Sequence, residues 1–369
     1  MYKLLVFFVF FSLLANGQAI PPVNNQNNSN QIEEKSNMKI QTQSLSRKDI
    51  NVQLKSFELN VYELQSELKM ISTSSIRKSP TLFQQQQMQL RLNEIEQINN
   101  QSFEYHLLNY QVGNYDFSKI NSLKAAEKLK PNDVTVLKEF SAYSYIKNDI
   151  AELNKYLQHL NSMRAFSKDL ELYAINVLHS LPSNSVLISH GEQDTYPLLI
   201  QQKLNNVRND VEIISLDHLQ SDEYRKRLKK QGYNIPKKDV IDTQFFDEFM
   251  KLNSDKYIVV AVSVPKSYLE KGKNLQNVGL GFSFENKASN AAKSNLIFFE
   301  NSLKSKINQH ISISKNGQLL GNYLPFLFDV RNSYILKKDF KSIDEIEKMI
   351  RMIGQKSNKT EQIKALLNK

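Results

Sequence analysis

Polar side chains of the kinds used in acid–base catalysis follow two short apolar segments of this chain. The first group comes directly after residues 186–189 (VLIS), and the second follows residues 211–216 (VEIISL). A histidine beside carboxylates can transfer protons or bind a metal, and a helix that begins there can receive an anion at its free N–H groups. The ligand-binding candidates are His190, Glu192, Asp194, Thr195, Asp217 and His218.

The two groups meet only if the apolar segments form adjacent parallel strands. The carboxyl ends of such strands share one edge of the sheet, where ligands bind in open α/β folds. The two histidines and the two aspartates would then converge. The alternative is structural: Asp194 or Thr195 caps the following helix, with Pro197 near its first turn, and Gly191 supplies a positive φ.

Other motifs that carry chemistry are incomplete. Neither Ser189 nor Ser263 lies in a Gly-x-Ser-x-Gly nucleophile elbow. Gly279 and Gly281 form a Gly-x-Gly without the third glycine, inside a predicted strand, which is a weak signal for a phosphate loop. We therefore predict no catalytic residue, no metal ligand and no cofactor from the sequence.

Alternating strands and helices position the candidate residues. Apolar segments at 186–189, 211–216, 257–264 and 278–285 read as strands, and the segments 196–204, 222–231 and 245–252 between them read as helices. This alternation predicts βαβ units, and a continuous apolar strand such as YIVVAVSV is buried on both faces. We predict a Rossmann-like, mostly parallel α/β domain over residues 182–315.

The remaining chain has helical periodicity, which makes the fold class α/β plus all-α. Residues 46–100 predict a helical hairpin that is broken at Ser79-Pro80. Residues 101–181 predict paired helices that turn at Asn114 and Asn148. That spacing of 34 residues resembles tetratricopeptide (TPR) repeats, with generic helical pairs as the alternative. Residues 316–369 predict C-terminal helices.

The N-terminus predicts export. A charged start, an apolar run from Leu4 to Ala15 and a small-x-small site make residues 1–17 a signal peptide cleaved near Gly17. Residues 18–45, rich in Asn, Gln and Ser, predict a disordered linker. We expect a periplasmic, outer-membrane-associated or extracellular protein without a transmembrane segment. It has no cysteine, so its stability depends on its apolar cores.

The chain is basic, with a formal charge of +10. One cluster of basic residues follows the second predicted strand. The simpler interpretation is a solvated helix face, and the more specific one is contact with an anionic surface. Export and the lack of interleaved aromatic residues argue against nucleic acid as a partner. The cluster consists of Arg225, Lys226, Arg227, Lys229 and Lys230.

Four segments together resemble one bacterial family. Residues 191–197 (GEQDTYP) are similar to its Gly-Asp-x-Asp-Thr-aromatic-Pro motif, and residues 207–216, 256–264 and 275–282 follow in the family's order. The family comprises multi-pass membrane proteins similar to protein O-mannosyltransferases, and the motif lies in their extracytoplasmic soluble domain. Glu192 and Asn209 depart from the usual aspartate and proline. The resemblance implies the soluble α/β module without the catalytic membrane domain.

Two functions follow as expectations. The first is an exported cell-envelope accessory protein that binds protein partners through its helical repeats and its α/β module, as a subunit of a secretion or glycosylation assembly. The alternative is a glycan-processing or other hydrolase with its site around His190 and Asp194. The discriminating feature is an enclosed space at the strand ends, which an enzyme needs and a capped, filled junction lacks.

Overall fold

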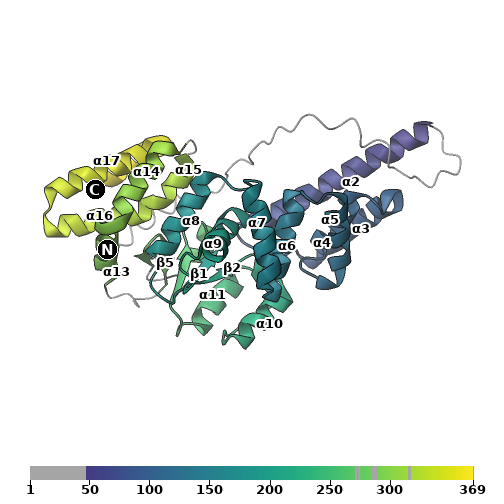
Figure 1. The fold of residues 1–369 in the computed structure, drawn as a ribbon, viewed down its shortest axis with the longest axis horizontal. Coiled ribbons are helices and arrows are strands. Elements are labelled where there is room, and N and C mark those ends of the chain that lie inside the picture. Colours follow the sequence, from purple (N-terminus) through teal and green to yellow (C-terminus); the bar gives the residue numbers. More distant parts are fainter. Residues whose placement is uncertain (1–46, 271, 273–274, 285–289, 315–316, 369) are drawn as a thin grey trace.

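The computed structural model describes residues 47–368, apart from 271, 273–274, 285–289 and 315–316. The predicted signal peptide (1–17) and linker (18–45) lie outside the described residues. The described part is mostly helical, with one five-stranded mixed sheet near its middle (Figure 1). None of its helices is long and apolar enough to cross a membrane.

Two helices occupy the region predicted as a hairpin. Helix α2 spans Arg47–Thr73 and helix α3 spans Leu82–Asn99. Thr81 begins α3 through a capping box with Gln84, which satisfies two N–H groups that a helix start leaves free. The pair has a small apolar cluster of its own, completed by α4 (Phe103–Val112) and separate from the main core.

Paired helices follow. They are α5 (Ile120–Leu129), α6 (Val134–Lys147), α7 (Ile150–Ser162) and α8 (Lys168–Ser180), with a short 3-10 turn, η2, at Phe117–Lys119. Asn114 and Asn148 both have positive φ, 49° and 60°, in the turns where the sequence places them. An asparagine tolerates this left-handed conformation better than most residues, so it ends a helix well.

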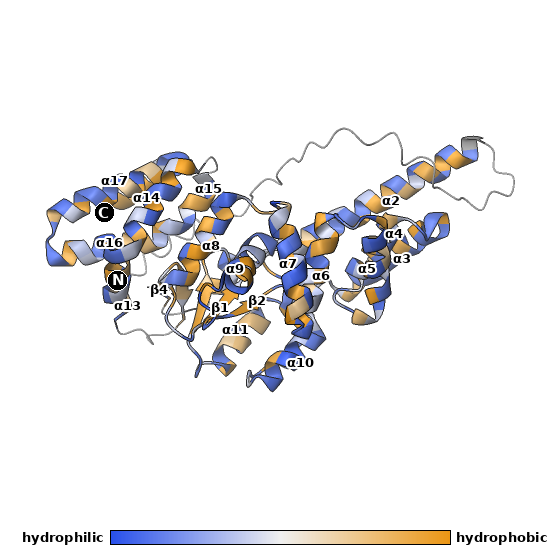
Figure 2. Ribbon diagram, viewed as in Figure 1, coloured by the Kyte–Doolittle hydropathy of each residue, from blue (hydrophilic) through white to orange (hydrophobic). Residues whose placement is uncertain are grey.

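The sheet has the strand order β2-β1-β3-β5-β4. The first three strands are parallel and form the predicted core: β1 (Val186–Ser189), β2 (Glu212–Ser215) and β3 (Ile258–Ala261). Apolar residues along β1 and β2 give these strands their orange colour in Figure 2. The connecting helices are α9 (Glu192–Asn205), α10 (Asp222–Lys230), α11 (Thr243–Leu252) and the single turn α12 (Lys266–Leu269), with a 3-10 turn, η3, at His218–Gln220.

The predicted fourth strand, residues 278–285, was wrong. The chain instead turns at Gly279 (φ 56°) and forms a hairpin of β4 (Gln276–Val278) and β5 (Gly281–Ser283). Strand β5 runs antiparallel to β3, so the sheet is mixed rather than mostly parallel. A Cβ at Gly279 would lie 2.2 Å from the backbone oxygen of Ser180, which is why this turn needs glycine.

The C-terminal part is helical, as predicted for residues 316–369, but the helices begin earlier. Residues 291–313, for which the sequence analysis predicted no helix, form α13 (Ala291–Phe298), the π-helical segment η4 (Phe299–Leu303) and α14 (Lys304–Ile313). The remaining elements are α15 (Gly317–Leu320), η5 (Gly321–Tyr323), α16 (Leu324–Lys337), α17 (Phe340–Lys356) and α18 (Thr360–Leu367).

One main apolar core runs from Leu107 on α4 to Leu367 on α18. Polar contacts also cross from the helical pairs to the sheet, since the Tyr145 hydroxyl donates to the backbone oxygen of Ile213. The helical pairs and the sheet therefore pack together as one body.

Candidate functional site

The ends of strands β1 and β2 lie side by side, as predicted. Ser189 at the end of β1 pairs in register with Ser215 at the end of β2. The two polar groups therefore meet at the carboxyl edge of the sheet. The backbone N–H of Gly191 donates to Asp217 Oδ2 at 2.5 Å, which joins the two groups directly.

Asp194 connects β1 to β3 rather than capping a helix. Helix α9 has Gly191 (φ 74°) as its N-cap, so the prediction of Asp194 or Thr195 as the cap was wrong. Asp194 Oδ2 accepts hydrogen bonds from the His190 backbone N–H (2.9 Å) and the Ser263 hydroxyl (2.8 Å). Burial raises the pKa of Asp194 to about 6.

The position of that contact matters for ligand binding. In the order β2-β1-β3-β5-β4, the chain continues from β1 to one side of the sheet and from β3 to the other, and open α/β sheets hold their ligands in the crevice at such a switch point. The hydrogen bond between Asp194 and Ser263 spans this point. In this protein, a hydrogen bond between two of its own side chains spans the position where open α/β sheets most often bind a ligand.

Thr195 and Glu192 have structural partners. The Thr195 hydroxyl lies 2.8 Å from the Ser189 hydroxyl and is buried. Glu192 is exposed and pairs with Lys138 of α6 at 2.5 Å. Thr195 thus ties the start of α9 to the end of β1, and Glu192 ties the same helix to the helical pairs.

His218 lies in an aromatic core. Its ring packs against the rings of Tyr115, Tyr145 and Tyr224, with centroids 5.8, 5.8 and 6.1 Å away, and the residue is only 4% exposed. Burial lowers the pKa of His218 to about 4, with Arg227 acting in the same direction and Asp217 opposing. His218 is therefore neutral at pH 7.

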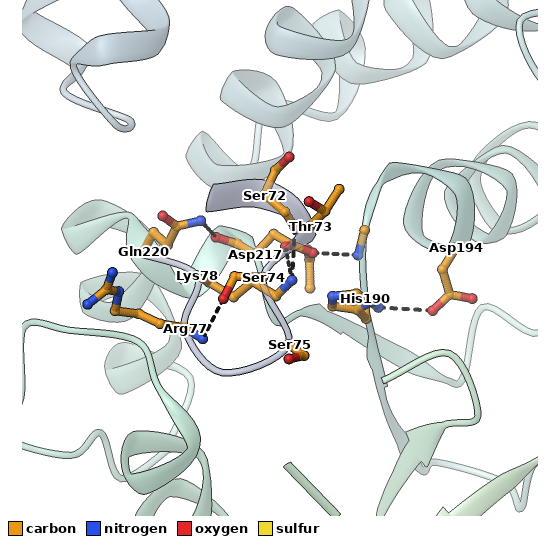
Figure 3. A network of polar contacts seen from close by, with 12 residues as sticks. Ser72, Thr73, Ser74, Ser75, Arg77, Lys78, His190, Asp194, Asp217 and Gln220 are labelled. Atoms are coloured by element: carbon orange, nitrogen blue, oxygen red, sulfur yellow. Dashed lines mark hydrogen bonds and ion pairs between the residues drawn. The ribbon is translucent and has the colours of Figure 1, made fainter. Parts of the chain in front are cut away.

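The structure adds a residue that the sequence analysis missed, Lys78 (Figure 3). It comes from the loop between α2 and α3, residues 74–81, and its side chain is fully buried. Its ammonium lies 3.8 Å from Asp217 Oδ1 and donates to the backbone oxygen of Ser72 at 2.9 Å. Burial lowers the pKa of Lys78, and the Asp217 carboxylate opposes that shift.

Asp217 is the shared acceptor of the network. Burial acts to raise its pKa, but His190, Lys78 and the Gly191 N–H all favour the carboxylate, and the pKa is lowered overall. His190 lies beside it, and burial lowers the pKa of His190 to about 4 despite the attraction of Asp217. At neutral pH the arrangement is therefore an ammonium paired with a carboxylate, next to a neutral imidazole.

The α2–α3 loop is anchored across this edge mainly by its backbone. The Lys78 N–H donates to the Ile241 oxygen at 2.8 Å, and the Ile241 N–H donates to the Ser79 hydroxyl at 3.1 Å. Arg77 and Asp242 form an antiparallel bridge. The loop therefore covers the strand ends at which a substrate would enter.

The predicted basic cluster lies on α10, beside the end of α6. Two of its arginines are structural, because Arg225 donates to the oxygens of Leu219 and Gln220 and Arg227 donates to those of Tyr145 and Ile146. Lys226 pairs with Asp222 and Glu223. The cluster borders a cavity of about 530 Å³ lined by Ile146, Lys147, Glu223, Lys226, Arg227, Lys229 and Lys230.

Nothing in the described ranges places three or more His, Cys, Asp or Glu side chains where they could hold a metal ion. The site is a set of buried, mutually bonded polar groups at the edge of a small α/β sheet within a helical protein. The family model described as TMEM260-associated domain 2 matches residues 170–364, more than half of the chain, and the chain belongs to this family. No curated protein and no solved structure matches it.

Proposed function

We propose that this chain is an exported accessory protein of the cell envelope that binds protein partners and serves as a subunit of a secretion or glycosylation assembly. The observation that carries the proposal is the filled edge of the sheet. Asp194, Thr195 and Asp217 each bond to groups of the fold, and the α2–α3 loop lies across them. A catalytic site requires an enclosed space for substrate at that edge.

The finer architecture fits the same proposal. We propose that α4–α7 are TPR-like repeats, which is supported by the two asparagine turns 34 residues apart. We propose a Rossmann-like origin for the unit built on β1–β3, since these strands are parallel and joined through helices. Repeats of this kind present extended surfaces to partners. The role in glycosylation is supported by the four segments that resemble the O-mannosyltransferase-like family.

Exposed apolar side chains indicate where a partner would bind. Large apolar side chains are normally exposed singly, whereas groups of them mark interaction sites. The α2–α3 region exposes the largest set, and the α4–α7 region exposes fewer. The exposed side chains of α2, α3 and their loop are Val52, Leu59, Tyr62, Met70, Ile76, Leu82, Phe83 and Leu90.

The test is capture of partners from the envelope fraction with the tagged full chain, followed by mass spectrometry. Leu59→Ser with Phe83→Ser removes exposed apolar surface from the hairpin, and Leu129→Ser removes it from the repeats. Leu336→Ser, at a position 86% exposed on α16, is the matched control. We expect the control to retain the partners and at least one of the other variants to lose them. Equal recovery by all variants contradicts the proposal.

The proposed location has a separate test. We propose export with cleavage near Gly17, because the first 17 residues have the charged, apolar and small-residue regions of a signal peptide. N-terminal sequencing of the protein recovered from the envelope should begin at Gln18. A protein that retains Met1 contradicts export by this signal.

One observation favours a hydrolase as the second candidate. Nε2 of His190 is buried without a hydrogen-bond partner among the described residues, beside the Asp217 carboxylate. A base that has not used its acceptor is available to a substrate. The test is a screen of glycans and esters with the wild type and with the double variant His190→Ala, Asp194→Ala. Activity that is equal in both proteins, or absent from both, excludes this candidate.

A further inference from the structure

We propose that the carboxyl edge of the sheet is a recognition site for an extended, lysine-bearing peptide segment of a partner, and that residues 76–79 fill it in cis. This inference rests on the proposed function and names the chemistry of one partner contact. The loop is an example of the ligand, seated in the site, and its contacts define what the site accepts.

The backbone contacts hold the segment in an extended form against the residues that precede α11, outside the sheet. Lys78 and Arg77 face Ile241 and Asp242 in antiparallel order, through the Lys78 N–H to Ile241 oxygen bond and the Arg77–Asp242 bridge. The Ser79 hydroxyl accepts the Ile241 N–H. Backbone bonds of this kind give affinity to any extended segment, and side-chain pockets then provide the selection.

The side-chain pocket selects a lysine. The Lys78 side chain is 0% exposed, and the group of the site that its ammonium meets is the Asp217 carboxylate, since the Ser72 oxygen lies on the occupying segment itself. A buried charge without its partner is strongly unfavourable, whereas an apolar side chain could fill such a space without any carboxylate. The loop could therefore be fixed to the sheet without the pair of Lys78 and Asp217. The pair is required only if the site recognises a cationic side chain.

The occupying segment can leave without opening either core. The hairpin has its own apolar cluster with α4, built from residues such as Phe57, Leu64 and Met88, and no loop residue belongs to it. None of residues 74–81 belongs to the main core either. Ser75 and Ile76 are exposed beside the buried Lys78. Release of the loop thus breaks polar contacts, including those that Ser267 and Tyr268 donate to the Ser75 and Ile76 oxygens, and removes no apolar side chain from either cluster.

The test uses the full chain and a fluorescent peptide with the sequence of residues 72–81 (STSSIRKSPT). In the wild type the cis segment competes at about millimolar effective concentration, so the peptide binds weakly. Lys78→Met removes the cis ammonium, and we expect the peptide to bind this variant at least about tenfold more tightly. Lys69→Met, at an exposed position of α2, is the matched control and should behave as the wild type.

Two further arms test the lysine itself. The same peptide carrying Lys78→Met should lose binding, and so should the wild-type peptide offered to a chain that carries both Lys78→Met and Asp217→Asn. Equal binding of the lysine and methionine peptides, or no gain in the Lys78→Met chain, overturns the inference. If peptide binding fails while partner capture through the hairpin or the repeats persists, the proposed function stands and this inference alone is rejected.

A measurement on the wild type covers the case in which the variants do not fold. Hydrogen exchange should show the amides of Lys78 and Ile241 opening together, at least about tenfold faster than the amides of β1. Amides of the loop that exchange only as slowly as those of β1 would mean that the segment leaves only on global unfolding, which overturns the inference.

Discussion

Replacing His218 with phenylalanine should remove a defined part of the acid sensitivity of this protein. His218 is 4% exposed among three tyrosine rings, and its pKa is lowered to about 4 by burial. The pKa of an unfolded histidine is about 6.5. His218→Phe keeps an aromatic ring in the same aromatic surroundings and removes the titrating group.

The sign follows from proton binding. Between pH 6.5 and pH 4 the unfolded chain binds a proton at His218, while the folded chain does not. The free energy of unfolding therefore falls as the pH falls through this window, and it is insensitive to this group above pH 6.5. A depression of about 2.5 pKa units corresponds to about 3 kcal/mol of stability lost by pH 4.

The assay is urea unfolding of the wild type and of His218→Phe, followed by far-UV circular dichroism at pH 7, 6, 5 and 4. The quantity compared is the difference between the two free energies of unfolding, because groups such as Asp194 titrate in both proteins and cancel. We expect this difference to shift by about 3 kcal/mol in favour of the variant between pH 7 and pH 4. A difference that is constant over this range, or that shifts in favour of the wild type, refutes the assignment of His218 as a buried neutral residue.

Four other changes have outcomes fixed by the structure. Gly279→Ala should lower the free energy of unfolding by at least about 3 kcal/mol, because φ is positive and the new Cβ meets a backbone oxygen. Gly232→Ala, at φ 86° with nothing within 4 Å of the added Cβ, should lower it by only about 1 kcal/mol in the same urea unfolding assay. Arg208→Lys should lower the free energy of unfolding in urea by about 2 kcal/mol, because the arginine donates to the backbone oxygens of Leu178, Leu181 and Pro182. A decrease no larger than that caused by the same substitution at an exposed position contradicts this structural role of Arg208. The pKa of Asp194 is raised to about 6, so the folded state binds its proton more tightly and stability falls as the pH rises from about 4 to about 6. Relative to the wild type, Asp194→Asn should gain about 2 kcal/mol over that window, and a flat difference in urea unfolding contradicts this.

The sequence predicted those parts of the fold that depend on local periodicity. The apolar seams of α2 and α3, the asparagine turns and the three buried strands are all encoded within windows of a few turns or strands. The adjacency of the two strand ends was also predictable, because strands buried on both faces are usually parallel neighbours. The register, Ser189 opposite Ser215, confirms this adjacency, whereas His218 lies among tyrosine rings and Asp194 binds Ser263.

The errors come from contacts between distant residues. Residues 278–285 alternate like one strand, and only the close approach of Ser180 to Gly279 makes the chain turn there. Lys78 gave no signal, because a lysine in a polar loop is normally exposed. Its burial depends on Asp217, which is 139 positions away in the chain. No local pattern contains such a pairing.

Most polar positions of the motif at residues 191–197 have structural partners, including Glu192, which pairs with Lys138 of α6, while Gln193 is exposed. Gly191 starts α9 with a positive φ, Asp194 binds Ser263 across the switch point, and Thr195 binds the end of β1. These contacts fix the shape of the chain at the start of α9, and this structural role does not require a substrate.

Asp217 is the point at which this fixed motif meets the replaceable loop. One of its oxygens accepts the N–H of Gly191, and the other faces the ammonium of Lys78. When the loop leaves, the carboxylate loses its cation but keeps its hold on the start of α9, so the strand ends stay in place while the negative charge becomes available. The same carboxylate therefore preserves the sheet edge and presents it to a lysine from another chain.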